Sequence, residues 1–237
     1  MQMQPVETHA YDTDQYAGDV QVVMSQVYLL MTIGLMITAV VAAAFAGNPQ
    51  WMINLFGRSP ILLIGLFLGQ ILLVVVLSAT VHRLAPGVAV GLFVLYSALN
   101  GVTLSSIFWV YTDASIVSTF MITAVTFGAM SFIGFVTKRD LTKLGSLLFM
   151  ALLGFAIASV VNLFLRSEGL YWLLTFGGIV IFVGLIAWDT QRIKQMAAMG
   201  LADGRSRGGV AVLGALRLYL DFINLFLLLL RIFGRRR

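Results

Sequence analysis

The sequence predicts an all-α membrane protein with seven transmembrane helices. Three observations support this fold class: 60% of the 237 residues are hydrophobic, only 11% are charged, and the mean hydropathy is +0.98. A soluble domain carries about 25% charged residues. A chain this apolar cannot bury its hydrophobic surface within itself, so we expect lipid to act as its solvent.

Seven continuous apolar runs account for the predicted membrane segments. A run of about 20 residues, coiled into a helix, is long enough to cross the hydrocarbon core of a bilayer. Transmembrane β-strands would instead show about ten residues of alternating polarity, and these runs do not alternate. The runs cover residues 25–46, 61–81, 88–110, 115–137, 145–165, 170–191 and 211–232.

Turn-forming or charged residues separate the predicted helices. Proline and glycine interrupt helical hydrogen bonding, and clusters of polar residues mark the loops between apolar runs. In chain order, the separating stretches are Gly47-Asn48-Pro49, Ser59-Pro60, Ala85-Pro86-Gly87, Thr112-Asp113, Lys138-Arg139-Asp140, Ser167-Glu168-Gly169 and residues 195–209. Most of these spacers are short, so neighbouring helices are expected to pack antiparallel.

The polar residues before the first run predict a separate segment. Residues 1–24 are acidic and rich in turn formers, so we expect a flexible tail followed by one transmembrane domain over residues 25–237. The first 19 residues hold four acidic side chains and neither lysine nor arginine. A cleaved signal peptide begins with a basic region, so none is expected here.

The basic residues predict the orientation of the chain rather than a nucleic-acid partner. The net charge is +5 and the pI about 9.8, but the positive side chains lie in short loops and at the C-terminus, where they suit topology signals and anionic lipid. A cytoplasmic N-terminus leaves eight basic residues in the loops after the second, fourth and sixth helices. The opposite loops then hold only Arg58 and Arg166, so the positive-inside rule predicts a cytoplasmic N-terminus.

Four arginines at the C-terminus depart from this pattern. Seven spans place them outside, whereas a last helix that re-enters the membrane would return them to the cytoplasm. We favour seven spans, and both arrangements remain open at this point. The residues are Arg231, Arg235, Arg236 and Arg237.

Two aspartates interrupt the last two apolar runs. Asp189 lies in GLIAWDTQRIK and Asp221 in LRLYLDFINLFLLLLRIFG. A carboxylate at the centre of a membrane helix costs roughly 3 kcal/mol on insertion scales, so charged residues there usually serve a function. Two adjacent carboxylates in a low dielectric share a proton readily, which makes the pair a candidate pH sensor and gate.

A deprotonated aspartate pair would also offer hard oxygen ligands to Ca²⁺. Calcium takes six to eight oxygens, so backbone carbonyls, water or Asn224 would have to complete a site built on Asp189 and Asp221. The pair also poses a problem of depth, because Asp221 lies near mid-membrane and Asp189 near the cytoplasmic end. The two meet only if the sixth helix extends past Arg192 or the seventh begins late.

A purely structural role is the alternative for both aspartates. Arg192 lies three residues after Asp189, and Arg217 lies four residues before Asp221. Both spacings place the two charges on one helix face, so each aspartate could be neutralised by the arginine of its own helix.

Four stretches of the chain resemble the Bax inhibitor-1 family, and most closely its bacterial inner-membrane branch. They are VLYSALNGVTLSSIF (94–108), FGAMSFIGFVTKRDL (127–141), AWDTQRI (187–193) and LGALRLYLDFINLFLLLLRIFG (213–234). The resemblance implies a seven-helix bundle in which the last helix is central within a surround of six. It also implies a multi-pass protein of the bacterial inner membrane.

The resemblance further implies a pH-sensitive calcium leak, in which Asp189 and Asp221 match the paired aspartates of the family. A family arginine on the second helix latches onto that pair, and the nearest basic candidate here is Arg83. Some bacterial relatives are instead linked to control of a membrane-bound protease. A regulatory partner that conducts nothing is therefore the second functional hypothesis.

Enzymatic activity is not expected. The chain has no cysteine, which excludes disulfides, thiolate metal sites and cysteine catalysis, and it contains neither an HExxH motif nor a Walker loop. Intramembrane aspartyl proteases also place one aspartate on each of two neighbouring helices, so they remain a remote alternative. Their second aspartate normally follows a Gly-x-Gly turn, and Leu218, Tyr219 and Leu220 stand before Asp221 here.

Overall fold

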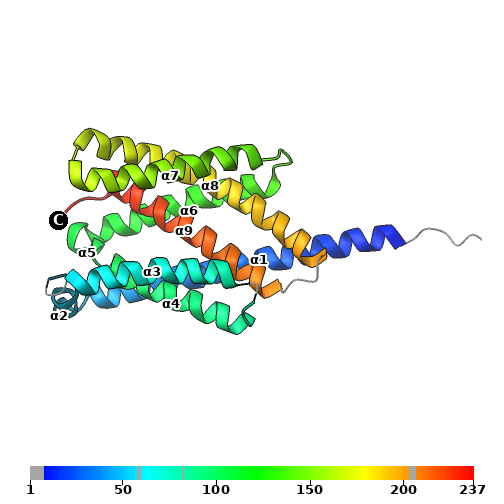
Figure 1. The fold of residues 1–237 in the computed structure, drawn as a ribbon, viewed down its shortest axis with the longest axis horizontal. Coiled ribbons are helices and arrows are strands. Elements are labelled where there is room, and N and C mark those ends of the chain that lie inside the picture. Colours follow the sequence, from blue (N-terminus) through cyan, green and yellow to red (C-terminus); the bar gives the residue numbers. More distant parts are fainter. Residues whose placement is uncertain (1–7, 58–59, 82, 203–206) are drawn as a thin grey trace, which may run out of the picture.

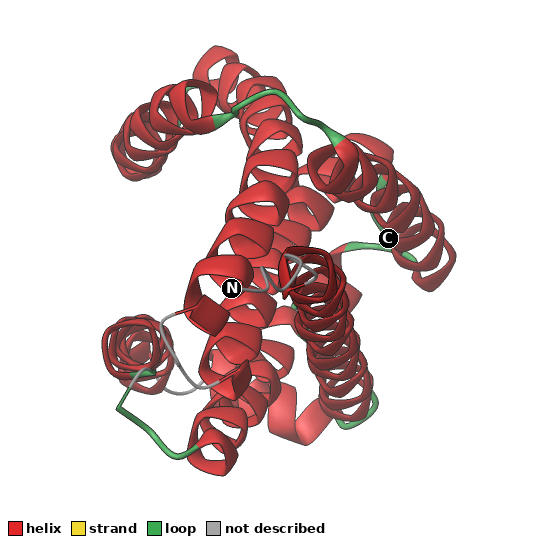
Figure 2. Ribbon diagram, turned by 90° about the vertical axis from the view of Figure 1, so that its right-hand side faces the viewer, coloured by secondary structure: helices red, strands yellow, loops and turns green. Residues whose placement is uncertain are grey.

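Helices make up almost the whole of the computed structural model, which describes residues 8–57, 60–81, 83–202 and 207–237 (Figure 1). Seven helical segments in these residues are long and apolar enough to cross a membrane, which confirms the predicted fold class. Figure 2, viewed from the end where α1 begins, draws only helix and loop for the described residues. The elements are α1 (Thr8–Ala46), α2 (Pro49–Met52), η1 (Ile53–Gly57), α3 (Pro60–Thr80), α4 (Pro86–Leu104), α5 (Ile107–Val110), α6 (Asp113–Val136), α7 (Thr142–Leu165), α8 (Glu168–Ala202) and α9 (Arg207–Phe233).

The last helix, α9, forms the centre of the bundle. It runs between one group formed by α1, α3 and α4 and another formed by α6, α7 and α8 (Figure 1). In the most apolar stretch of α9, 78% of the residues are buried, whereas the corresponding share is at most 39% in any other span. Helices α1, α4, α6 and α8 pack directly on α9, while α3 packs on α4 and α7 on α8 at the outside. The expected central position of the last helix is confirmed.

The first helix begins earlier than the sequence predicts. Helix α1 starts at Thr8, inside the stretch that we expected to be a flexible tail. Val20, Val23 and Met24 are already buried in the core. Polar residues therefore extend the first membrane helix beyond one end of the apolar run, and the apolar pattern alone places the boundary too late. Residues 1–7 of the predicted tail lie outside the described part of the chain.

The C-terminal arginines lie at the end of the bundle opposite to the start of α1, because α9 crosses it as one continuous helix (Figure 1). The segment after α9 is tied to the turn before α6: the Thr112 amide donates to the Arg235 carbonyl at 2.9 Å and the Arg237 amide to the Val110 carbonyl at 3.0 Å. Arg237 also pairs with Asp113 at 2.6 Å. The alternative of a re-entrant last helix is therefore wrong.

Candidate functional site

The two intramembrane aspartates come together at the interface of α8 and α9. Asp189 on α8 and Asp221 on α9 are 7% and 5% exposed, and their carboxyl groups are within hydrogen-bonding reach of each other. They can meet because α8 continues to Ala202, well past Arg192, and α9 begins at Arg207. Most of the stretch that the sequence left as a long loop is thus helix, which removes the problem of depth.

An arginine from the other helix neutralises Asp189. The Arg217 guanidinium on α9 donates to Asp189 Oδ1 on α8 at 3.2 Å. Arg192 instead lies exposed over the ring of Trp188, 5.0 Å from its centroid. The hydrogen-bonded partner of Asp189 is thus Arg217 of α9 rather than Arg192 of its own helix, and the ion pair ties α8 to α9.

Asp221 carries a carboxyl oxygen that the surrounding protein leaves without a donor. Its Oδ2 is buried and has no hydrogen-bond partner among the described residues, and the neighbouring Asp189 carboxylate is an acceptor as well. A hydrogen bond between two carboxyl groups requires one of them to hold a proton. One proton on the pair, together with Arg217, leaves the cluster with no net charge, which suits a buried position.

The remaining predicted partners do not join the pair. The Asn224 amide donates to the Leu220 carbonyl of its own helix at 2.8 Å. Arg83 is exposed in the turn between α3 and α4, and no described contact links it to either aspartate. The described residues contain no cluster of three or more acidic, histidine or cysteine side chains that could hold a metal ion. Arg217, rather than Arg83, holds the aspartate pair in this structure.

The three polar residues of the Asp-Thr-Gln motif each contact a different neighbour. Asp189 pairs with α9, and Thr190 bonds to Ser131 of α6 at 3.0 Å. Gln191 accepts from the Leu141 amide at 2.9 Å and donates to the Arg139 carbonyl at 2.8 Å. One turn of α8 thus organises the aspartate pair, the contact with α6 and the loop between α6 and α7.

A second buried polar cluster lies on α9 beside the aspartates, and the sequence indicated only part of it. The Tyr219 hydroxyl is bonded to Thr38 of α1 at 2.6 Å and accepts from the Asn100 amide of α4 at 2.8 Å. Tyr219 is fully buried. A mid-membrane amide such as Asn100 signals an interhelical hydrogen bond, but nothing in the sequence identifies Tyr219 as its partner.

Removing the Tyr219 hydroxyl should destabilise the bundle measurably. Tyr219→Phe keeps the ring but leaves Thr38 and Asn100 each without one bonding partner in a buried place, which costs about 1–3 kcal/mol. The measurement is thermal unfolding of the purified protein in detergent. Tyr28→Phe, which loses one partly buried bond to Ser131, is the control with the smaller expected loss. Equal losses would contradict a special role for Tyr219.

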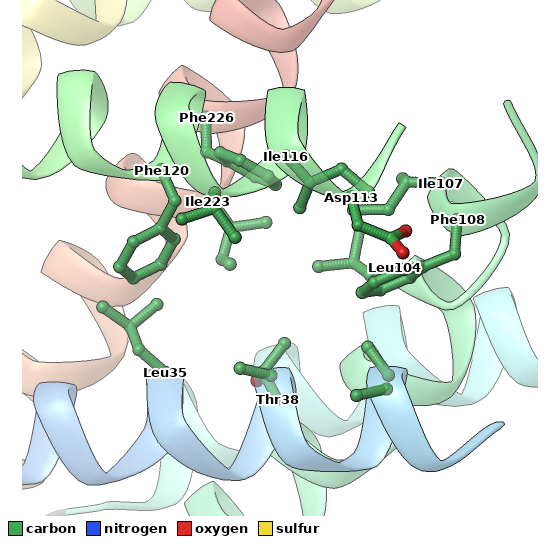
Figure 3. Close-up of a pocket in the computed structure, with 14 residues that line it drawn as sticks. Leu35, Thr38, Leu104, Ile107, Phe108, Asp113, Ile116, Phe120, Ile223 and Phe226 are labelled. Carbon is green, nitrogen blue, oxygen red and sulfur yellow. The ribbon is translucent and has the colours of Figure 1, made fainter. Parts of the chain in front are cut away.

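Cavities approach this region from both ends of the bundle. One of about 340 Å³ lies between α1, α6 and α9; Figure 3 shows Leu35 and Thr38 on one wall facing Phe120 and Phe226 on the other. A more polar cavity of about 550 Å³ adjoins it and shares the residues Ala43, Phe108 and Asp113. At the opposite end, a cavity of about 540 Å³ is lined by Gln191 and by basic residues including Lys138 and Lys194.

Comparison with known proteins identifies relatives over almost the whole chain. The family model described as "Inhibitor of apoptosis-promoting Bax1" matches residues 20–237. The inner membrane protein YbhL of Escherichia coli is 53% identical over 224 residues, which cover 94% of this chain and 95% of that protein. A protein of Borreliella burgdorferi is 49% identical over 214 residues (90% and 92%), and one of Deinococcus radiodurans is 40% identical over 217 residues (92% of each chain).

Proposed function

Since the chain belongs to the Bax inhibitor-1 family, we propose that it is a pH-gated calcium leak of a bacterial inner membrane. The observation that carries the proposal is the buried contact between the carboxyl groups of Asp189 and Asp221, with Arg217 as their counter-ion. Ionisable side chains inside a membrane bundle mark ion or proton paths more often than structural joints.

The proposed gate is the interface of α8 and α9. With one proton on the pair, the cluster is neutral and the two helices are tied together by Arg217 and Asp189. Loss of that proton places a second negative charge beside Asp189. The two carboxylates then repel each other, which favours separation of the helices and attracts a divalent cation. We therefore propose that the leak opens as pH rises.

The cavities support a closed conformation, because those at the two ends of the bundle are lined by neither Asp189 nor Asp221. The chamber in Figure 3 is lined mostly by apolar side chains. An apolar passage excludes ions when it holds no water. The cavity at the opposite end reaches Gln191, two residues beyond Asp189. The aspartate pair would then be one barrier between two vestibules. Within the described parts of the chain no third acidic, histidine or cysteine side chain joins the two carboxylates, and such a pair suits a cation that passes rather than one that stays.

We propose a cytoplasmic N-terminus for the membrane orientation. The loops that the sequence predicts on the side of the N-terminus hold eight basic residues, against two in the opposite loops, and this difference favours the direction by the positive-inside rule. The C-terminal arginines would then face the periplasm.

Calcium flux in liposomes tests the gate. Flux into vesicles holding a calcium dye should rise with pH for the unchanged protein. In Asp221→Asn it should stay at the low-pH level throughout, because an amide cannot lose a proton in this range. Asp140→Asn is the matched control: hydrogen bonds from Thr142 lower the pKa of this exposed carboxyl, so it remains ionised over the range tested.

Two results would reject the calcium leak. One is an absence of flux at every pH, which would favour the non-conducting partner of a membrane protease, to be sought by crosslinking in native membranes. The other is an unchanged pH response in both Asp189→Asn and Asp221→Asn.

A further inference from the structure

A basic cavity at the C-terminal end of the bundle has no part in the proposed gate. It has a volume of about 550 Å³ and brings together Arg166 from the end of α7, Arg231 from α9 and Arg236 from the segment that follows. Three positive charges face one carboxylate, that of Glu168. The ion pairs recorded among the described residues involve none of these three arginines.

The backbone holds Arg236 at this cavity. Tyr111 and Arg236 form an antiparallel bridge, flanked by the bonds of Thr112 to Arg235 and of Val110 to Arg237. Successive side chains of an extended segment point to opposite sides. Accordingly Arg236 lines the basic cavity, while Arg237 lines a different cavity and pairs with Asp113.

Arg231 is also held in place. Its guanidinium lies 5.2 Å from the centroid of the Tyr171 ring, which itself lines the cavity. A guanidinium stacked on an aromatic ring retains all its hydrogen-bond donors at the edge of the plane. It is thus available to an anion without first having to leave another charged partner.

Arg166 occupies a backbone conformation that glycine adopts far more readily. Its φ is 50°, the left-handed region, and it is the only non-glycine residue with a positive φ in the described chain. A helix that ends in this way usually carries glycine at that point. A non-glycine residue held in this backbone conformation, with its side chain lining a cavity, is a candidate for a functional role.

The cavity also lies at the start of the longest helix of the second group. Helix α8 has 35 residues and begins at Glu168, so the positive end of its dipole is directed toward the cavity. Ser167 accepts a hydrogen bond from the Leu170 amide at 3.3 Å, which leaves other amides of the first turn as additional donors.

We infer that this cavity binds a phosphate group. Three guanidinium groups around a polar space that has room for a tetrahedral anion match the geometry by which arginine recognises phosphate. Tyr171 and Trp172 line the cavity, and such residues lie at the level of lipid headgroups. The phosphate could therefore belong to an anionic lipid or be free in solution. Two of the four C-terminal arginines that depart from the positive-inside pattern, Arg231 and Arg236, gain a function on this account.

Binding to the full-length protein tests the inference in two settings. In a neutral detergent, the protein is titrated with inorganic phosphate by calorimetry. In nanodiscs of phosphatidylcholine with or without phosphatidylglycerol, native mass spectrometry counts the retained anionic lipid. Arg236→Gln should weaken binding about tenfold, as expected for the loss of one charge-assisted contact. Arg235→Gln, which removes an equal charge from the same segment outside the cavity, should leave binding unchanged.

A second variant separates binding from folding. Arg166→Gly removes a charge while relieving the left-handed backbone, so it should unfold at the same or a higher temperature and still bind about tenfold more weakly. Retention in the phosphatidylglycerol arm alone identifies a lipid headgroup, and binding in the detergent arm alone identifies a free anion. Absence of binding in both arms, or equal losses in Arg235→Gln and Arg236→Gln, would overturn the inference.

Discussion

Arg217→Gln is expected to destabilise the protein by about 2 kcal/mol. Breaking a fully buried ion pair by removing one partner costs about 3–5 kcal/mol, because the other charge is left uncompensated. Asp189 is 10% exposed at its side chain, but Arg217 is 31% exposed, so water screens part of the interaction and the loss should fall below that range. Thermal or denaturant unfolding in detergent measures the difference.

Two further variants establish the cause of that loss. The double variant Arg217→Gln with Asp189→Asn should be more stable than Arg217→Gln alone, because the uncompensated carboxylate has also been removed. Arg192→Gln removes a similar charge close to Asp189, but its guanidinium lies over Trp188 and is exposed. It should change stability by less than about 0.5 kcal/mol. A loss in Arg192→Gln as large as that in Arg217→Gln would contradict the ion-pair assignment.

Gly134→Ala is expected to cost about 3 kcal/mol or more and to loosen α6 from α8. A β-carbon at this position would collide with the backbone of Ala187, whose carbonyl cannot move aside as a flexible side chain can. Overpacking a well-packed interior typically costs about 1–3 kcal/mol, and a backbone obstacle belongs at the top of that range. Because Ala187 lies two residues before Asp189, displacement of α8 should also disturb the aspartate pair.

The matched control lies on the same helix. Gly128 has open space where its β-carbon would be, so Gly128→Ala should be neutral or slightly stabilising, as alanine favours a helix over glycine. Unfolding temperatures of the two variants in the same detergent give the comparison. If both substitutions were tolerated equally, the close approach of α6 and α8 at Gly134 would be refuted.

The membrane-spanning helices are the part of this fold that the sequence predicts well. The seven apolar runs predicted most helix boundaries to within a few residues. Polar groups are costly in lipid, so the ends of an apolar run indicate the ends of a membrane span. The exceptions are the polar ends of two helices. Helix α1 begins at Thr8 and α8 runs to Ala202. Polar residues continue both helices beyond their apolar runs, and a hydropathy pattern does not detect such extensions.

The aspartates could be singled out from the sequence, but their partners could not. Asp189 and Asp221 are conspicuous because each interrupts an apolar run, and the spacing of Arg217 suggested a bond within its own helix. The ion pair with Asp189 depends on the rotation of α8 against α9, which packing along the whole interface decides. The bond of Tyr219 to Thr38 joins residues 181 positions apart, and no local pattern encodes such a contact.

The central place of α9 has a consequence for biosynthesis. This helix supplies Arg217 to Asp189 and Tyr219 to both Thr38 and Asn100, so earlier helices find these polar partners only after six other spans have left the ribosome. Until α9 is inserted, the other six spans contain polar side chains, such as Asp189, Thr38 and Asn100, that lack their partners on α9. A chain truncated before α9 should therefore remain a target for membrane quality control, and assembly of the bundle is expected to follow the synthesis of α9 rather than accompany that of the earlier spans.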